Sequence, residues 1–137
     1  MRKQVETALT VCPVEVAVSV LGGAWKLTIV KHLLGGRRRF GELGRLVGTV
    51  NPRVLTRQLR ELEADGLVDR TVYPEVPPRV EYSLTELGAS LEPAVAWLDR
   101  WGATYAGTVQ KQADSTSSAI PQDPSSRNST PPMRLPG

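Results

Sequence analysis

Apolar residues recur with helical spacing most clearly in the middle of the chain. Leu55, Leu59 and Leu62 are four and three residues apart, which places them on one face of a helix. Asn51 can cap the free amides of the first turn, and Gly66 can adopt the left-handed backbone that ends a helix. The pattern therefore predicts a helix over residues 51–65. Its outer face is polar and basic, with Arg53, Thr56, Arg57 and Arg60.

The hydrophobic period changes after this helix. Residues 67–73 and 80–84 are rich in residues that favour strands, and the proline-containing segment 74–78 between them predicts a turn. A helix with a basic face followed by a hairpin is the order of elements in a winged helix-turn-helix.

Four further helices are predicted from apolar stripes that end at glycine or capping residues. They cover residues 13–21, 24–34, 41–47 and 86–106. In the second, Lys26 is expected to face outward, and in the third, Leu46 is expected to be buried. Pro93 lies inside the last helix and should bend it, because proline removes an internal hydrogen bond. The predicted fold is mostly α with a small β-hairpin (α+β), a winged helix-turn-helix with an N-terminal helix and a C-terminal helix.

The last helix is apolar on more than one side. One stripe is enough for a helix that packs on its own domain, so part of this surface is expected to be buried against a second copy of the chain. Six apolar residues, one from the first helix, are the candidates for dimerisation: Val14, Leu91, Val95, Leu98, Trp101 and Tyr105.

The two ends of the chain differ from the middle in composition. Residues 1–11 have no strong pattern and are expected to form a flexible N-terminal arm. Residues 109–137 are rich in Ser, Pro and Gln, and are expected to be disordered because they cannot bury enough apolar surface to offset the entropy of ordering. One domain over residues 12–108 remains.

Charge favours a polyanionic partner. The formal net charge is +3, and residues 37–80 hold nine arginines and six acidic residues, so the whole excess lies around the predicted helix and hairpin. No apolar run is long enough to span a membrane, and the first residues lack a signal-peptide pattern, which favours a cytoplasmic protein. Cys12 is the sole cysteine, so an intrachain disulfide is excluded.

Several short motifs occur in an order that resembles one protein family. They are CPVE (12–15), GGAWK (22–26), RFGEL (39–43), LTRQLRELE (55–63), DGLV (65–68) and PPRVEYSLT (77–85). Their order and spacing resemble the HxlR-type bacterial transcription regulators, a branch of the MarR-like winged-helix group, over residues 12–102. Arg53 departs from the family, in which Lys is common at this position.

The resemblance implies a homodimeric, sequence-specific DNA-binding transcription regulator. No cofactor is expected. The helix over residues 51–65 would enter the major groove, and the wing, residues 73–80, would contact the backbone or a minor groove. A double-stranded, pseudo-palindromic operator would then carry half-sites about one helical turn apart. An oxidant or a small-molecule effector is also implied, because some members respond through a cysteine near the position of Cys12.

Nine residues are candidates for DNA contacts: Asn51, Pro52, Arg53, Thr56, Arg57, Arg60, Arg79, Lys26 and Arg39. Arg53 or Arg57 could make a bidentate contact with a guanine. Arg60 lies one turn further along the helix and is expected to contact phosphate or to pair with a nearby glutamate. Taken alone, Arg53, Thr56 and Arg57 would fit an ordinary solvated helix face better, and it is the order of the motifs that favours DNA contact.

The basic residues outside that helix also have alternatives. A DNA contact by Arg79 in the wing competes with a surface ion pair to Glu75. Arg39 could contact phosphate or serve a structural role beside Phe40. Lys26, at the start of a predicted helix, could donate to a phosphate together with the free amides there.

Cys12 fits two opposed roles. At a helix start its thiolate would be favoured, as in a redox sensor. The other role is that of a small buried hydrophobe, since free cysteine is among the most buried residue types. His32 has no partners of metal-ligand type at suitable spacing, so no metal site is expected.

Two other classes of function compete with a DNA-binding regulator. A winged-helix module that binds a protein through the same face would not require sequence-specific DNA binding, and its DNA affinity would not fall steeply with salt. An enzyme is disfavoured, because the sequence shows no nucleophile–base pair, carboxylate dyad or phosphate-cradling loop.

Overall fold

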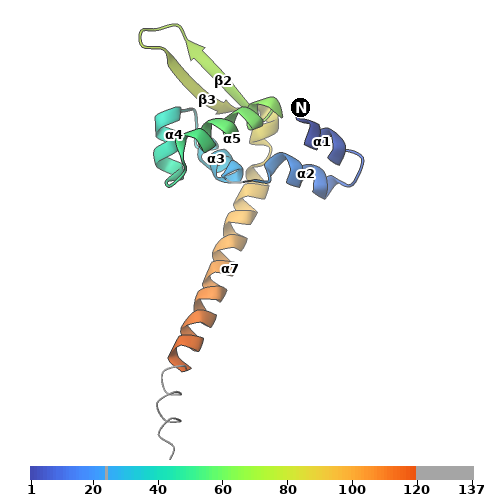
Figure 1. Ribbon diagram of the computed structural model, residues 1–137, viewed down its shortest axis with the longest axis vertical. Helices are drawn as coiled ribbons and strands as arrows, with labels where there is room; N and C mark the ends of the chain where they lie inside the picture. Colours follow the sequence, from blue (N-terminus) through green and yellow to red (C-terminus); the bar gives the residue numbers. More distant parts are fainter. Residues whose placement is uncertain (24, 120–137) are drawn as a thin grey trace, which may run out of the picture. The chain divides into compact units, whose positions relative to one another are not determined.

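The computed structural model describes residues 1–23 and 25–119 (Figure 1). The chain divides into two compact units, one over residues 1–96 and the other beginning at Trp97. Along the described residues the elements are α1 (Lys3–Ala8), α2 (Pro13–Leu21), α3 (Lys26–Leu33), β1 (Arg38–Arg39), α4 (Phe40–Val47), α5 (Pro52–Ala64), β2 (Val68–Tyr73), β3 (Arg79–Leu84), α6 (Glu86–Ala89) and α7 (Glu92–Ala119).

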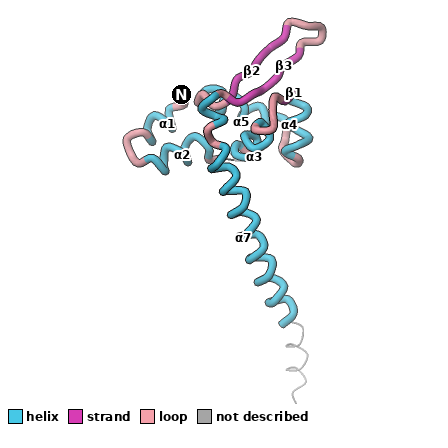
Figure 2. Tube along the Cα trace, turned by 180° about the vertical axis from the view of Figure 1, so that it is seen from behind, coloured by secondary structure: helices cyan, strands magenta, loops and turns pink. Residues whose placement is uncertain are grey.

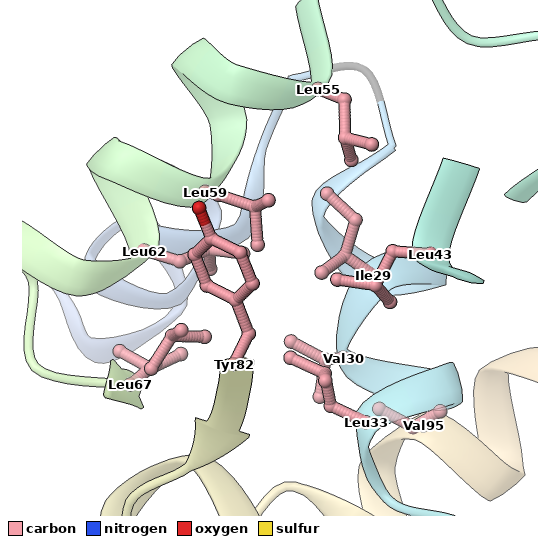
Figure 3. Close-up of a cluster of buried hydrophobic side chains, with 11 residues drawn as sticks. Ile29, Val30, Leu33, Leu43, Leu55, Leu59, Leu62, Leu67, Tyr82 and Val95 are labelled. Atoms are coloured by element: carbon pink, nitrogen blue, oxygen red, sulfur yellow. The ribbon is translucent and has the colours of Figure 1, made fainter. Parts of the chain in front are cut away.

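A single cluster of buried apolar side chains holds the first unit together (Figure 3). The leucine face of α5 forms one side of it, with Leu55, Leu59 and Leu62 at most 1% exposed. These side chains meet Ile29 of α3 and Leu43 of α4, both fully buried. Burying each such side chain contributes about 1.5–3 kcal/mol, so this face fixes how α5 presents its opposite side. The predicted leucine stripe is confirmed.

The ends of α5 are formed by the predicted residues. The Asn51 side-chain oxygen accepts a hydrogen bond of 2.7 Å from the Arg53 amide. Gly66 has a φ of +82°, and the amides of Gly66 and Leu67 donate back to the carbonyls of Glu63 and Leu62. This paired closure of the last turn ends α5 and directs the chain into the sheet.

The hairpin is confirmed and is joined by a third strand (Figure 2). β2 and β3 pair antiparallel from Val68 opposite Leu84 to Tyr73 opposite Arg79. The two-residue strand β1 pairs with β3 on its other side, which gives the order β1-β3-β2. A strand of two residues has no detectable period, so the sequence pattern could not predict it.

The predicted last helix is in fact two helices. Thr85 caps the short α6, as expected, by accepting from the Gly88 amide at 3.0 Å. α7 then begins at Glu92, so Pro93 lies in a first turn, where no internal hydrogen bond is lost, and the predicted helix is interrupted just before the proline. α7 also runs to Ala119, so the prediction of disorder is wrong for residues 109–119. The rest of the predicted tail lies outside the described residues.

The expected flexible arm, residues 1–11, contains helix α1, and Arg2 anchors it. The Arg2 amide and guanidinium donate to the two carboxylate oxygens of Asp65 at 2.9 and 2.7 Å, and the guanidinium also donates to the Ser19 carbonyl at 2.8 Å. Val5 is 4% exposed. A six-residue helix is too short to be stable alone, which is why its own pattern did not reveal it.

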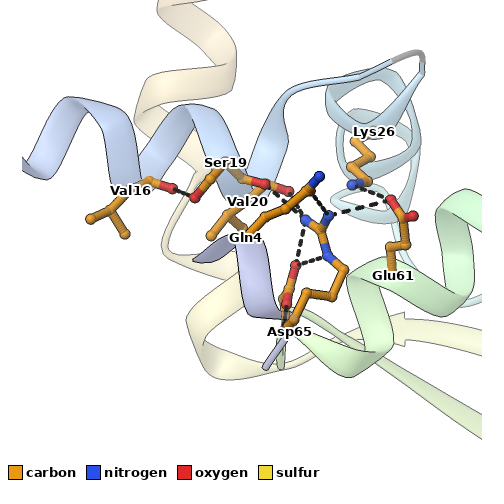
Figure 4. A network of polar contacts seen from close by, with 8 residues as sticks. Gln4, Val16, Ser19, Val20, Lys26, Glu61 and Asp65 are labelled. Carbon is orange, nitrogen blue, oxygen red and sulfur yellow. Dashed lines mark hydrogen bonds and ion pairs between the residues drawn. The ribbon is translucent and has the colours of Figure 1, made fainter. Parts of the chain in front are cut away.

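Lys26 is buried, so the prediction that it faces outward is wrong. It is 1% exposed, and its Nζ lies 2.6 Å from a carboxylate oxygen of Glu61 on α5 (Figure 4). Lys26 precedes Ile29, Val30 and Leu33 by three, four and seven residues, so it shares their inward face. Its apolar stem can be buried because Glu61 compensates the charge.

The prediction that Leu46 is buried is also wrong. Leu46 is 43% exposed, whereas Leu43 of the same helix is fully buried.

Among the described residues, no single helix is long and apolar enough to cross a membrane, and only the sharply bent pair α2 and α3 reaches that length and composition when taken together.

Candidate nucleic-acid interface

The outer face of α5 carries basic side chains that form no ion pair among the described residues. Arg53, Arg57 and Arg60 are exposed, and none of them forms an ion pair or a side-chain hydrogen bond within the described part of the chain. Thr56 is half-buried and donates its hydroxyl to the Pro52 carbonyl at 2.9 Å. An open groove of about 690 Å³ runs along this face, and all five of these residues line it. The helix therefore offers three unneutralised guanidinium groups side by side.

Arg79, at the start of β3, is held by its neighbours. Its guanidinium carbon lies 4.0 Å from the centre of the Tyr73 ring, a cation–π contact across the hairpin. Its nitrogens lie 3.2 Å from a carboxylate oxygen of Glu75 and 3.7 Å from one of Glu81. The ion pair with Glu75 that the sequence suggested as an alternative to DNA contact is thus present.

Arg39 reaches the same carboxylate from β1. Its Nε lies 4.0 Å from a carboxylate oxygen of Glu81, and Arg37 lies 3.7 Å from the other oxygen. Arg37 also donates to the Tyr73 hydroxyl at 3.0 Å. The Glu81 carboxylate is therefore the common neighbour of arginines from β1, β3 and the segment before β1.

Glu81 was not among the residues predicted from the sequence. It follows Arg79 by two residues in a strand, so the two side chains lie on one face of the sheet, and this spacing was the available signal. Its proximity to Arg37 and Arg39 depends on the pairing of β1 with β3, with Arg39 opposite Glu81, which the sequence did not reveal.

The nine candidate residues do not form one surface. Asn51, Pro52, Arg53, Thr56, Arg57 and Arg60 belong to α5 or its cap, and Arg39 and Arg79 to the edge of the sheet and the wing. A second hollow, of about 480 Å³, is lined by the wing turn and by Arg39 and Arg79. Lys26 lies under α5 in its ion pair with Glu61, so it is removed from the candidate interface.

The six candidates for dimerisation also separate. Val95 is 6% exposed and belongs to the chain's own core, and Leu91 packs against that core, so neither forms a free surface. Leu98, Trp101 and Tyr105 of α7 are 40–59% exposed, and the Trp101 and Tyr105 rings stack at 5.5 Å. Val14, on α2, is exposed.

Cys12 is exposed, which removes its role as a small buried hydrophobe. It occupies the residue before α2, and Pro13 follows in the first turn.

Burial lowers the pKa of His32 below its ordinary value, and the positive charges of Lys31 and Arg38 lower it further. No group of three or more His, Cys, Asp or Glu side chains among the described residues could hold a metal ion.

Residues 20–110 match the HxlR-like helix-turn-helix family. The uncharacterized HTH-type transcriptional regulator YdeP of Bacillus subtilis is 47% identical over 100 residues, which span 73% of this chain and 78% of YdeP. The solved structure of the redox regulator HypR in its oxidized form is 52% identical, with a TM-score of 0.64 over 68% of this chain and 96% of that one. The reduced form of the transcriptional regulator YodB from B. subtilis is 36% identical, with a TM-score of 0.59 over 66% and 89% of the two chains. The chain therefore belongs to the HxlR-like helix-turn-helix family of transcriptional regulators.

Proposed function

We propose that this protein is a dimeric, sequence-specific DNA-binding regulator that acts in the cytoplasm and binds a pseudo-palindromic operator. The observation that carries the proposal is the outer face of α5, where Arg53, Arg57 and Arg60 are exposed and lack acidic partners within the described residues. A helix in this position of a helix-turn-helix enters the major groove.

In this proposal the N-terminal half of α5 distinguishes bases. Arg53 and Arg57 present guanidinium groups that can donate two parallel hydrogen bonds to O6 and N7 of a guanine. Thr56 lies between them and offers its methyl group to a thymine, because its hydroxyl already donates to the Pro52 carbonyl. Asn51 and Pro52 lie closest to the DNA at the start of the helix, and Arg60 contacts phosphate.

The sheet contributes contacts with the DNA backbone. Arg79 and Arg39 flank the hollow at the wing turn, and from there they donate to phosphates or enter a minor groove. Phosphate contacts fix the register of a protein on DNA but carry no sequence information. The wing therefore orients α5, and α5 supplies the specificity.

The second copy docks through α7. Leu98, Trp101 and Tyr105 give this helix a large exposed apolar face, and Val14 on α2 is a further candidate. An isologous contact between two such faces buries both at once. The operator then has two half-sites related by the same twofold axis, about one helical turn apart.

Cys12 is proposed as a site of thiol-based control. It is exposed at the start of α2, and the similar structures include the redox regulator HypR in oxidized form and YodB after diamide treatment. A disulfide formed by this residue must join two molecules or a small thiol, because the chain has no second cysteine. Diamide should weaken operator binding, thiol should restore it, and Cys12→Ser should not respond. Inhibition that persists in Cys12→Ser would remove this part of the proposal.

Selection from a random duplex library, followed by footprinting of the enriched sequence, tests the main proposal. We expect an enriched site with approximate twofold symmetry and two protected blocks about ten base pairs apart. A library that shows no enrichment over several rounds would contradict sequence-specific binding. Enrichment of one unsymmetrical block would retain DNA binding but contradict the dimer.

A further inference from the structure

Three guanidinium groups surround the carboxylate of Glu81. The nearest nitrogens of Arg37, Arg39 and Arg79 lie 3.7, 4.0 and 3.7 Å from its two oxygens. The Glu81 side chain is only 17% exposed, whereas those of Arg37 and Arg39 are at least half exposed. The carboxylate therefore lies beneath a layer of arginines at the edge of the sheet.

None of these three contacts is a hydrogen bond, because each distance exceeds about 3.5 Å, beyond which N–H···O bonds are not formed. The guanidinium groups are held by charge while many of their N–H donors remain available. Nε of Arg79 is shielded from solvent and has no hydrogen-bond partner in the described structure. In a hydrogen-bonded salt bridge, by contrast, the N–H donors of the guanidinium group are already used by the carboxylate.

The arginines differ in what else supports them. Arg37 donates to the Tyr73 hydroxyl, and Arg79 stacks on the Tyr73 ring. Glu81 is the only carboxylate paired with the Arg39 guanidinium among the described residues, although the Arg39 amide bonds Glu42. Three like charges on one edge repel each other, so neutralising Glu81 would release Arg39 first and loosen the other two.

We propose that Glu81 is a positioning residue for DNA recognition, which holds Arg37, Arg39 and Arg79 in one fixed arrangement and reduces their attraction for arbitrary DNA. The inference rests on the proposed function. Fixed arginines match the phosphates of a correctly docked operator, whereas released arginines bind phosphates in any register. Glu81 thus increases selectivity without contacting a base.

The test compares Glu81→Gln with Glu75→Gln on the enriched duplex and on a scrambled duplex of equal length. Both variants remove one negative charge near the wing, but among the described residues Glu75 forms an ion pair only with Arg79. We expect Glu81→Gln to bind the scrambled duplex about fivefold more tightly, since unpaired charges at a rim raise non-selective association. The selectivity ratio, which is the affinity for the enriched duplex divided by that for the scrambled duplex, should fall by at least the same factor. Glu75→Gln should leave the ratio within about twofold of wild type, as expected for an exposed pair.

Two outcomes overturn the inference. One is an unchanged selectivity ratio in Glu81→Gln, and the other is an equal fall in both variants, which would reduce Glu81 to one charge among several. A wild-type protein that binds neither duplex overturns the proposed function itself, and with it this role. Wild-type selectivity with an unaffected Glu81→Gln overturns only the role of Glu81.

A measurement without DNA distinguishes the positioning role of Glu81 from a general folding defect. Arginine Nε–H signals in NMR spectra of the free protein should shift or broaden for Arg37, Arg39 and Arg79 in Glu81→Gln, and remain unchanged for Arg53 and Arg57. Unchanged signals in the sheet arginines would contradict the positioning role. If Glu81→Gln does not fold, Glu81→Asp gives the same comparison, because it retracts the carboxylate by one methylene from contacts that are already long.

Discussion

The two groups of arginines on the first unit differ in how they are held. Arg53 and Arg57 on α5 have no ion-pair partners within the described residues, whereas Arg39 and Arg79 at the sheet are gathered around Glu81. In the proposed complex the bases differ from site to site, whereas the phosphates around a docked α5 take one arrangement. The arginines that contact those phosphates can therefore be fixed in advance. The proposed function accordingly assigns site selection to the α5 group and docking geometry to the sheet group.

Breaking the dimer should weaken operator binding most, because one half-site then loses both groups of arginines. Leu98→Glu places a charge on the exposed apolar face of α7, and we expect monomers that lose binding to the enriched duplex by more than about 100-fold, since one half-site supplies far fewer contacts. Ala103→Glu adds the same charge on the other side of that helix and should stay dimeric. Sedimentation and a binding titration measure both. A dimeric Leu98→Glu would show that the interface lies elsewhere.

Arg57→Ala tests the α5 group. It should weaken binding to the enriched duplex by about 1–3 kcal/mol, roughly 5- to 150-fold, and binding to a scrambled duplex much less, because a bidentate base contact is lost. Arg100→Ala on α7 removes an arginine outside both groups and serves as the control. Equal losses on the two duplexes would move Arg57 to the phosphate-contacting group.

Lys26→Met tests whether this lysine belongs to either group. Because Lys26 is buried against Glu61, we expect the free energy of unfolding to fall by about 1–3 kcal/mol, as when a partly buried charge loses its partner. The salt dependence of DNA binding should stay as in wild type. Lys111→Met, on the exposed face of α7, is the matched control for stability. A reduced salt slope in Lys26→Met would return this lysine to the interface.

Arg79→Ala tests the sheet group. Losing a phosphate contact should weaken binding to both duplexes by a similar factor, and should reduce the slope of log K against log salt by about 1. Titrations at several salt concentrations measure this. A loss confined to the enriched duplex would instead assign Arg79 a role in base or minor-groove recognition.

His32 should give the smallest effect. Its carbonyl accepts from Arg38 at the sheet edge, and its side chain has a pKa below the ordinary 6.5. The unfolded chain therefore binds a proton more readily, so the free energy of unfolding is highest above about pH 6.5 and falls as the pH drops through and below that value. His32→Gln should flatten the decline, as measured by urea unfolding at several pH values. A decline that is equal in both proteins would assign it to other groups.

The sequence predicted those elements in which apolar residues repeat over several helical turns. α5 was predicted with its boundaries, because three leucines, a capping Asn51 and Gly66 agree with one another. The prediction for Lys26 is wrong because a charge favours an outward position, whereas the spacing from Ile29 and Leu33 puts this residue on the buried face. The partner that makes this burial favourable, Glu61, is far away in the sequence.

Contacts between distant segments account for the other differences. α1 is stabilised by the bond of Arg2 to Asp65, a pairing that no local pattern reveals. Glu81 acquires two of its three arginines through the pairing of β1 with β3. The candidate DNA-binding face of α5 could thus be proposed from sequence, whereas the polar cluster around Glu81 needed the structure.

Base contact by α5 is tested most directly by a titration of the wild-type protein against the enriched duplex and its scrambled counterpart at physiological salt. We expect binding to the enriched duplex to be at least about 1,000-fold tighter, as is typical of specific regulators. Equal affinity for the two duplexes would contradict a base-contacting α5, and would leave the arginines of this helix a non-selective or protein-binding role.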